Sequence, residues 1–420
     1  MKRATSIYLY FLLGFYPLVF SHDGLSDIFA TKRFFFFAAT GVYLISVFIL
    51  CLISRKKVRL NAPVTFALIF LFITALSSFL SPSFPKTLLG VSRYEGLFTV
   101  FLYVSLFICF SLFGSVSKGH VYTLIGSSAV FGAICVLQLQ GMNPLTLYPK
   151  GYTFFDGGVR YSGSYIGTIG NADLVGAYLC IVIPILFYVL FKSRLKFRFL
   201  SFIPLVLLLY TVSKMSVMAA IVGLLAGAIF ALPDFLKLSH RAVLIYSMAI
   251  LSTAVVSMAV LRNHDIGTGF LHELHEILNG RILPEFGSNR IRIWNNVLST
   301  IHEAPILGKG PDTMLLERFE KFSTFYPTLN KTLTTSIDIA HNEYLNILYH
   351  QGILGLISYL ALIVSVLKRA LPSRNTCTEA LAVAVVSYLS QAFFGFSMCL
   401  VSPFFWVILA LASQKESVAK

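Results

Sequence analysis

The chain contains twelve apolar runs that approach or exceed the length of a membrane-spanning helix, and short polar segments separate most of them. A helix needs about 20 mostly apolar residues to cross the hydrocarbon core of a bilayer. Only 12% of the 420 residues are charged, against about 25% in a soluble domain. This pattern excludes a soluble enzyme, a disordered chain and a secreted disulfide scaffold. It predicts an all-α integral membrane protein with about twelve transmembrane helices. The runs cover residues 7–20, 34–54, 63–80, 97–114, 121–138, 174–191, 199–212, 215–232, 242–261, 344–367, 380–396 and 399–411.

The distribution of charge predicts how these spans are oriented. With the N-terminus in the cytoplasm, the inner segments hold 18 of the 33 Lys and Arg residues but only three of the 18 acidic ones. The whole net charge of +15 then lies on the cytoplasmic side, as the positive-inside rule requires. The basic balance is therefore explained by a lipid bilayer rather than by nucleic acid. Both termini are expected in the cytoplasm.

The polar material gathers in two outer loops, which divide the chain into three parts. We expect a membrane bundle over residues 1–261, with spans one to nine and the outer loop 139–173. An extracytoplasmic loop subdomain follows over residues 262–343, and spans ten to twelve form a second membrane part over residues 344–420. Long outer loops place the working surface outside the cytoplasm.

The larger loop contains a predicted amphipathic helix and a glycine-rich turn. Ile291, Trp294, Leu298 and Ile301 recur at helical spacing, directly after Arg290. Gly308 and Gly310 allow a tight turn, and Pro311 suits the first position of a helix over residues 311–322. The turn is either structural or a phosphate site, and the arginines are either ligands or a solvated face.

His341, Asn342 and Glu343 lie where the large loop enters a span. Asn342 can cap the following helix, with Glu343 in its first turn. The imidazole of His341 is suited to general-base chemistry because its pKa is normally near neutrality.

Five motifs, in order along the predicted outer side, resemble those of the O-antigen ligase and O-antigen polymerase family. They are Gly90-x-x-Arg93-Tyr-Glu-Gly-Leu97, Arg160 with Gly167-Thr-Ile-Gly-Asn171, Arg290-x-x-x-Trp294, Pro305-x-x-Gly-x-Gly-Pro-Asp312, and Ala340-His-Asn-Glu-Tyr-Leu345 followed by Gly352-Ile-Leu-Gly355. Two positions depart from the family pattern. Lys214 stands where the family commonly has Arg, and Asn171-Ala172-Asp173 stands where it often has Asn-Pro-Asn.

The resemblance implies a bacterial inner-membrane glycosyltransferase of the all-helical, GT-C-like fold, acting in cell-envelope polysaccharide biosynthesis. Such an enzyme takes a glycan from an undecaprenyl-pyrophosphate carrier at the outer leaflet. It passes the glycan with inversion to an acceptor hydroxyl on a glycan or lipid-glycan, and it needs no metal or other cofactor.

The resemblance also implies roles for particular side chains. Arg290 and Lys214 would neutralise the diphosphate, with Arg93 and Arg160 as secondary contacts. His341 would be the base, oriented by Asn342, Glu343 or Asp338. Asn171 and Asp312 complete the set of expected substrate contacts.

Two alternatives stay open from the sequence. One is a protein O-oligosaccharyltransferase of the same family, which differs only in its acceptor. The other is a lipid-linked glycan flippase or transporter. A flippase would need charges within its spans, whereas the predicted spans are nearly free of charge.

Overall fold

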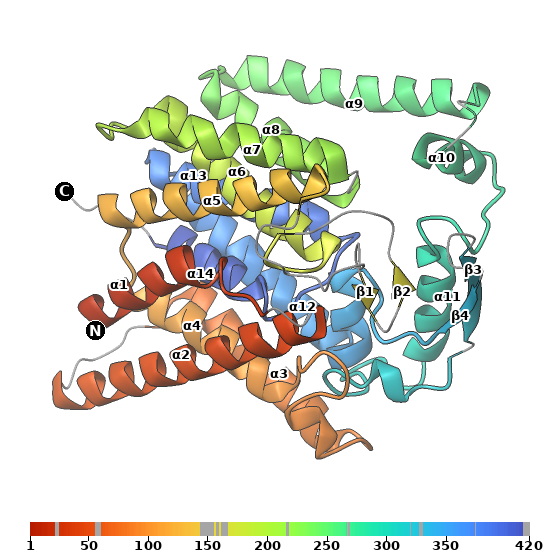
Figure 1. The fold of residues 1–420 in the computed structure, drawn as a ribbon, viewed down its shortest axis with the longest axis horizontal. Coiled ribbons are helices and arrows are strands. Elements are labelled where there is room, and N and C mark those ends of the chain that lie inside the picture. The colour runs from red at the N-terminus through yellow and green to blue at the C-terminus, as the bar shows by residue number, and fades with distance from the viewer. Residues whose placement is uncertain are drawn as a thin grey trace.

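Among the described residues, helices cover most of each of the twelve apolar runs in the computed structural model (Figure 1). The structure describes residues 1–21, 25–54, 60–142, 155–156, 159–160, 167–215, 218–265, 267, 269–319, 321–326, 331–373 and 375–414. The helices on apolar runs are α1 (Lys2–Tyr10, continued by a π-helical turn Phe11–Phe15), α2 (Leu25–Ser54), α3 (Ala62–Leu80), α4 (Leu97–Phe113), α5 (Lys118–Leu139), α6 (Ala172–Lys192), α7 (Phe202–Met215), α8 (Met218–Phe235), α9 (His240–Asn263), α12 (Glu343–Ala370), α13 (Thr376–Ala392) and α14 (Ser402–Ala412).

Seven helices in the described part of the chain are long and apolar enough to cross a membrane: α2, α3, α5, α6, α8, α9 and α12. Two more, α4 and α14, are apolar but shorter. The chain is therefore a multi-pass helical membrane protein. The total of twelve spans stays a prediction.

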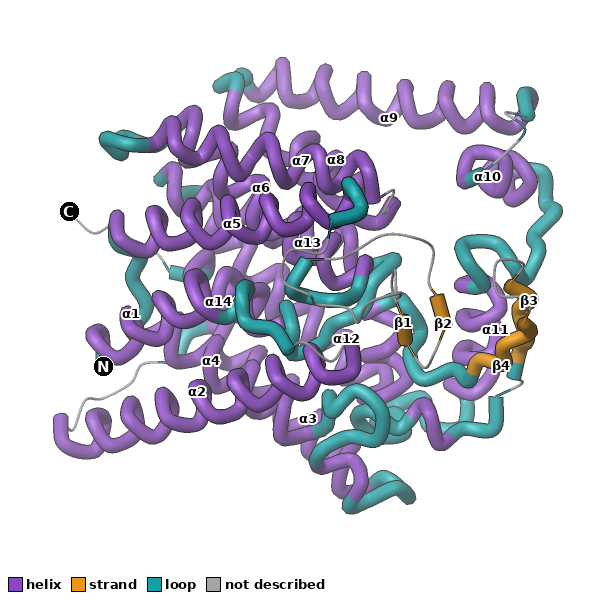
Figure 2. The backbone as a smooth tube through the Cα atoms, viewed as in Figure 1, coloured by secondary structure: helices purple, strands orange, loops and turns teal. Residues whose placement is uncertain are grey.

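The loop between α9 and α12 carries its own small elements, shown on the right of Figure 2. They are α10 (Phe270–Leu278), α11 (Arg290–Ile301), and a hairpin of β3 (Phe322–Tyr326) and β4 (Lys331–Thr335). A second, shorter hairpin pairs β1 (Phe155–Asp156) with β2 (Val159–Arg160) in the other predicted outer loop.

The N-terminus lies at one end of the bundle, and α10, α11 and the β3–β4 hairpin lie at the opposite end (Figure 1). We name these the inner end and the outer end. Contacts between helix ends follow the same division. At the inner end, Ser111 bonds Ser413 (3.0 Å) and Arg369 donates to the Ser413 carbonyl (2.8 Å).

At the outer end, Ser77 donates to the His350 carbonyl (2.6 Å), and Gln391 donates to the Asp173 carbonyl (3.2 Å). These contacts place the ends of α4, α12 and α14 at the inner end, and the ends of α3 and α13 with the start of α6 at the outer end. The orientation of the chain in the membrane stays a prediction.

The helix α2 begins before the apolar run that predicted it, and this places Lys32 inside the bundle. The side chain is fully buried, and Nζ donates to the carbonyls of Tyr16 (2.7 Å) and Pro17 (3.3 Å). These carbonyls end the first helical segment, where a cation is favourable. The spans are thus less free of charge than the sequence suggested.

The helix α11 is confirmed, but its packed face differs from the predicted stripe. Ile293 and Val297 are buried, with Trp294 and Ile301 packed beside them, whereas Leu298 is exposed. The helix packs against α12, so contacts with the bundle determine which face is covered.

The expected helix over residues 311–322 is wrong. The structure has a short 3₁₀ turn, Met314–Leu316, and β3 begins at Phe322. Asp312 has a positive φ of 53°, and its carboxylate accepts from the backbone amides of Ser92 (3.1 Å) and Arg93 (2.9 Å). These long-range bonds hold the chain in a turn, so the proline does not start a helix.

The turn that precedes Pro311 is joined to a break in α12. Gly352 has a positive φ of 67° in the middle of that helix, and a Cβ there would lie 2.2 Å from the carbonyl oxygen of Ile306. Backbone bonds run on both sides of the break, from Gly310 N to His350 O (3.0 Å) and from Ile353 N to Pro305 O (2.9 Å). Gly308 and Gly310 thus have a structural role, because they allow the turn before Pro311 to approach the backbone of α12 closely.

Candidate active site

His341 is held just before α12 by bonds to its neighbours. Trp294 donates through Nε1 to the Ala340 carbonyl (2.9 Å), and Asn346 accepts from the Ala340 amide (2.8 Å). Asn342 caps α12 as predicted, with its Oδ1 accepting from the Leu345 amide (3.0 Å). Both sides of the His341 backbone are therefore fixed.

The ring of His341 points to a carboxylate on a distant helix. Its Nδ1 lies 3.1 Å from Oδ2 of Asp173, the second residue of α6. Its ring also meets Phe396 edge-on, at 5.3 Å between centroids. The sequence predicted Asn342, Glu343 or Asp338 as the partner that orients His341, whereas the structure places Asp173 there.

Arg290 reaches the same carboxylate from the start of α11. One terminal nitrogen lies 3.1 Å from Oδ2 of Asp173, and the other donates to the Gly287 carbonyl (3.0 Å). The Nε of Arg290 is buried and has no hydrogen-bond partner among the described residues. Asp173, Arg290 and His341 together form the outer site, and two of them were predicted from the sequence.

Asn171 has a clear part in this arrangement. Its Oδ1 accepts from the amides of Asp173 (3.0 Å) and Leu174 (3.2 Å), so it caps α6. The cap fixes the first turn of the helix and with it the backbone of Asp173. Asp173 was missed as a site residue because its partners lie more than a hundred residues away. The local signal was an acid in a first helical turn, which is usually explained by the helix dipole.

Arg93 belongs to a second cluster beside the outer site. Its Nε lies 2.7 Å from Oδ2 of Asp338, and its guanidinium lies 5.5 Å from the centroid of the Phe396 ring. Phe396 is thus a neighbour of both Arg93 and His341.

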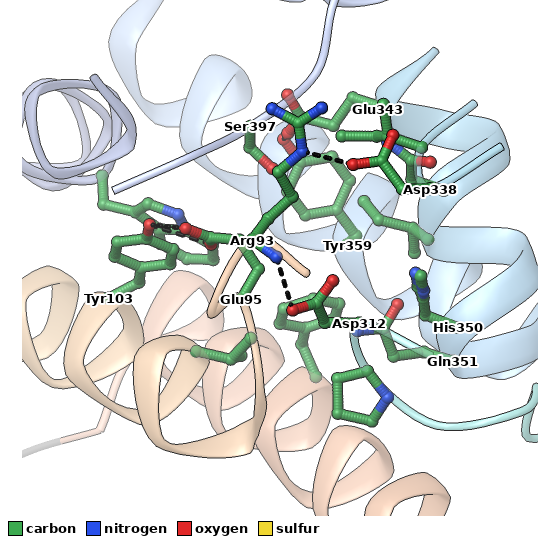
Figure 3. Close-up of a pocket in the computed structure, with 17 residues that line it drawn as sticks. Arg93, Glu95, Tyr103, Asp312, Asp338, Glu343, His350, Gln351, Tyr359 and Ser397 are labelled. Carbon is green, nitrogen blue, oxygen red and sulfur yellow. Dashed lines mark hydrogen bonds and ion pairs between the residues drawn. The ribbon is translucent and has the colours of Figure 1, made fainter. Parts of the chain in front are cut away.

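A small acidic cavity lies behind Arg93 (Figure 3), and its volume is about 90 Å³. It is lined in part by Glu95, Asp312, Asp338 and Glu343. Burial raises the pKa of Asp312 and raises that of Glu95 well above its usual value. A cavity of this size has room for several ordered waters.

Glu343 lies at the start of α12 and turns into the bundle. It is buried and accepts hydrogen bonds from Tyr359 (2.7 Å) and Tyr388 (3.0 Å). Asp312 is similarly occupied with backbone amides of the loop before α4. Both carboxylates therefore support the scaffold around the site.

Lys214 and Arg160 lie outside these clusters as far as the structure describes them. Lys214 is exposed near the end of α7, with Nζ 5.9 Å from the centroid of the Tyr210 ring. Its described contacts do not join it to Asp173, Arg290 or His341. Arg160 lies in β2, and its side chain is outside the described residues.

Comparison with known proteins shows a match between part of the chain and a protein family. Residues 199–360 match a family described as O-antigen ligase. This segment is similar to an O-antigen ligase domain and covers less than half of the chain. The matched segment includes Lys214, Arg290 and His341, and Asp173 lies before it. This confirms the family resemblance drawn from the motifs and supports a membrane glycan ligase- or polymerase-like role.

A relative was also found in Haemophilus influenzae. It is an uncharacterized protein, 21% identical over 332 residues, which cover 77% of this chain and 76% of the relative. The similarity thus extends well beyond the O-antigen ligase domain.

Proposed function

We propose that the chain transfers a glycan from an undecaprenyl-pyrophosphate carrier to an acceptor hydroxyl at the outer end of the bundle. The observation that carries this proposal is the convergence of His341 and Arg290 on the carboxylate of Asp173. A base beside a cation is what the reaction needs, because a hydroxyl must lose its proton while a diphosphate leaves with negative charge.

Asp173 orients the base. If Nδ1–H of His341 donates to Asp173, the lone pair of Nε2 is free to accept the proton of the acceptor hydroxyl. The acceptor oxygen then bonds to the anomeric carbon as the bond from that carbon to the pyrophosphate oxygen breaks. Attack opposite the leaving group inverts the anomeric centre.

The charge of the outer site changes in step with the reaction. With neutral His341, the charges of Arg290 and Asp173 cancel. When His341 takes the proton, the three side chains carry one net positive charge as the diphosphate leaves. A fixed cationic site of this kind is a strong source of transition-state stabilisation when water is excluded.

The remaining predicted residues take supporting parts in the proposal. Lys214, on the outer end of α7, supplies a second cation for the diphosphate, and Arg93 and Arg160 contact the glycan or diphosphate. Asn171, Asn342, Asp312 and Glu343 position these groups. The outer end faces away from the cytoplasm of a bacterial inner membrane, because the inner segments carry the excess of Lys and Arg.

His341→Gln tests the proposal in a purified transfer assay with carrier-linked glycan. Loss of a positioned base costs about 10²–10⁴-fold in rate, and donor binding should persist. His302→Gln is the matched control, since His302 is exposed at the end of α11. Transfer by His341→Gln near the wild-type rate contradicts the assignment of the base.

The same assay separates the possible acceptors. Carrier-linked repeats, lipid A core and protein hydroxyls should be supplied in turn, with release of free undecaprenyl pyrophosphate as the readout. The acceptor that supports release identifies a polymerase, a ligase or a protein oligosaccharyltransferase. Movement of the lipid-linked glycan across the bilayer without release would indicate the flippase alternative.

A further inference from the structure

A large cavity opens at the inner end of the bundle, far from the outer site. Its volume is about 900 Å³, some ten times that of the acidic cavity behind Arg93. Residues of α1, its π-helical continuation, α5, α6, α13 and α14 line it. Nothing in the proposed transfer reaction uses this space, so it needs a separate explanation.

The walls of this inner cavity are mostly apolar. They include Leu9, Leu13, Leu124, Ile185, Leu381 and Ile408. Protein interiors are packed to high density and rarely leave voids larger than a water molecule. Pockets that hold small molecules have volumes of about 300–1,000 Å³. In a helical membrane protein, the apolar material at hand for such a space is an acyl chain.

The rim of the cavity is basic. Lys118, Lys192 and Arg194 all lie on it. Lys192 pairs with Glu379 at 3.3 Å. Lys118 and Arg194 are exposed, and neither has a carboxylate partner among the described residues. Two cations at one mouth therefore remain available for an anion.

Two helix N-termini lie at the same rim and add to its positive charge. Ser117 caps α5, and Asn375 caps α13; both residues line the cavity. The amide end of a helix carries partial positive charge and favours anions. The mouth thus combines side-chain and backbone charge above an apolar chamber.

We propose that the inner cavity binds an anionic membrane phospholipid, such as phosphatidylglycerol. An acyl chain lies along the apolar walls, and the phosphodiester lies between Lys118 and Arg194. Basic pockets between transmembrane helices on the cytoplasmic side are a known form of anionic-lipid site. Free phosphate would interact only with the cations of the rim. A neutral lipid would interact only with the apolar walls.

Thermal unfolding in lipid nanodiscs tests the site. The purified chain is compared in discs of phosphatidylcholine alone, with added inorganic phosphate, and with phosphatidylglycerol mixed in. We expect phosphatidylglycerol to raise the unfolding midpoint, whereas inorganic phosphate leaves it unchanged. The same lipid should remain bound through purification and be counted by native mass spectrometry.

The variant Lys118→Gln with Arg194→Gln should weaken phosphatidylglycerol binding by about 30-fold, because each cation near the headgroup contributes about fivefold. Lys237→Gln with Arg241→Gln is the control, since both residues are exposed at the inner end and neither lines the cavity. Val121→Trp tests the chamber itself, because a larger ring on this half-buried wall residue fills it.

Three results would overturn the proposal. One is an equal midpoint shift in the test and control double variants. Another is an unfolding midpoint with phosphatidylglycerol that equals the midpoint in discs of phosphatidylcholine alone. The third is displacement of phosphatidylglycerol by a small amount of polyprenyl phosphate, which would assign the cavity to the lipid carrier.

Discussion

The two proposed sites differ in how two of their cations are held. At the outer end, Arg93 and Arg290 are each paired with a carboxylate of another segment, Asp338 and Asp173. At the inner end, Lys118 and Arg194 line a wide cavity without a carboxylate partner in the described part of the chain. Fixed pairs preorganise a site for one reaction geometry. Unpaired cations suit a mobile anionic headgroup. The two arrangements are those that the two proposals require: a transfer site at the outer end and a lipid site at the inner end.

Among the variants that test this comparison, Asp173→Asn should have the largest effect on the transfer rate. The amide no longer fixes the imidazole tautomer or balances Arg290, and comparable loss of an orienting carboxylate in a serine protease costs about 10⁴. We expect transfer to fall by about 10³-fold. The measurement is the single-turnover rate with carrier-linked donor at saturation.

Glu379→Gln is the matched control for Asp173→Asn. It breaks an ion pair of similar exposure at the inner end: Lys192 and Glu379 are each 21% exposed, against 20% and 17% for Arg290 and Asp173. Transfer should change little. If the two variants lose equal activity, the outer pair is only structural.

Arg290→Ala should lower transfer by about 10²-fold, as loss of one preorganised donor does in other enzymes. Arg290→Lys keeps the charge but loses the planar fork, so we expect a loss of about tenfold. Rates and donor affinity are measured for both variants. Equal rates for the Ala and Lys variants would show that the positive charge of Arg290 does not contribute to transfer.

Lys214 sharpens the comparison because it is a cation of the outer end without a described carboxylate partner. If it contacts the diphosphate, Lys214→Ala should raise the KM for donor by about tenfold, while Lys214→Arg is tolerated. Full activity of a folded Lys214→Ala protein would restrict the diphosphate contacts to the arginines.

Chelation should have the smallest effect. The described residues contain no group of three or more His, Cys, Asp or Glu side chains placed to hold a metal ion. Because Arg290 and Lys214 are proposed to carry the charge balance, strong chelators should leave the transfer rate unchanged. A loss that magnesium or manganese restores would contradict the cation-only mechanism.

The sequence predicted well what local physics decides. Apolar runs marked helices, and Asn342 marked the start of α12 because capping depends on residues three positions apart. It failed where distant segments meet. Asp173 pairs with Arg290 and His341, and Asp312 turns the chain to reach the amides of Ser92 and Arg93. Neither pairing leaves a periodic signal in the chain.

The position of Lys32 inside the bundle also depends on a contact between separate segments. In the sequence, Lys32 and Arg33 stand directly before an apolar run, where both would be expected as flanking charges at a membrane boundary. The carbonyls of Tyr16 and Pro17, which end another helix, make the burial of Lys32 possible. Side-chain position in a membrane protein thus depends on which backbone groups a neighbouring segment leaves unpaired.

The break in α12 has a consequence for how this chain can vary. Backbone bonds on both sides of Gly352 clamp the glycine-rich loop to the helix, and His341 lies at the start of the same segment. The number of residues between His341 and Gly352 therefore fixes the direction in which the His341 side chain points. One inserted residue would rotate His341 by about 100° around the helix axis and turn it away from Asp173. Loops exchanged between relatives should therefore work only when the transplanted piece includes the helix as far as Gly352.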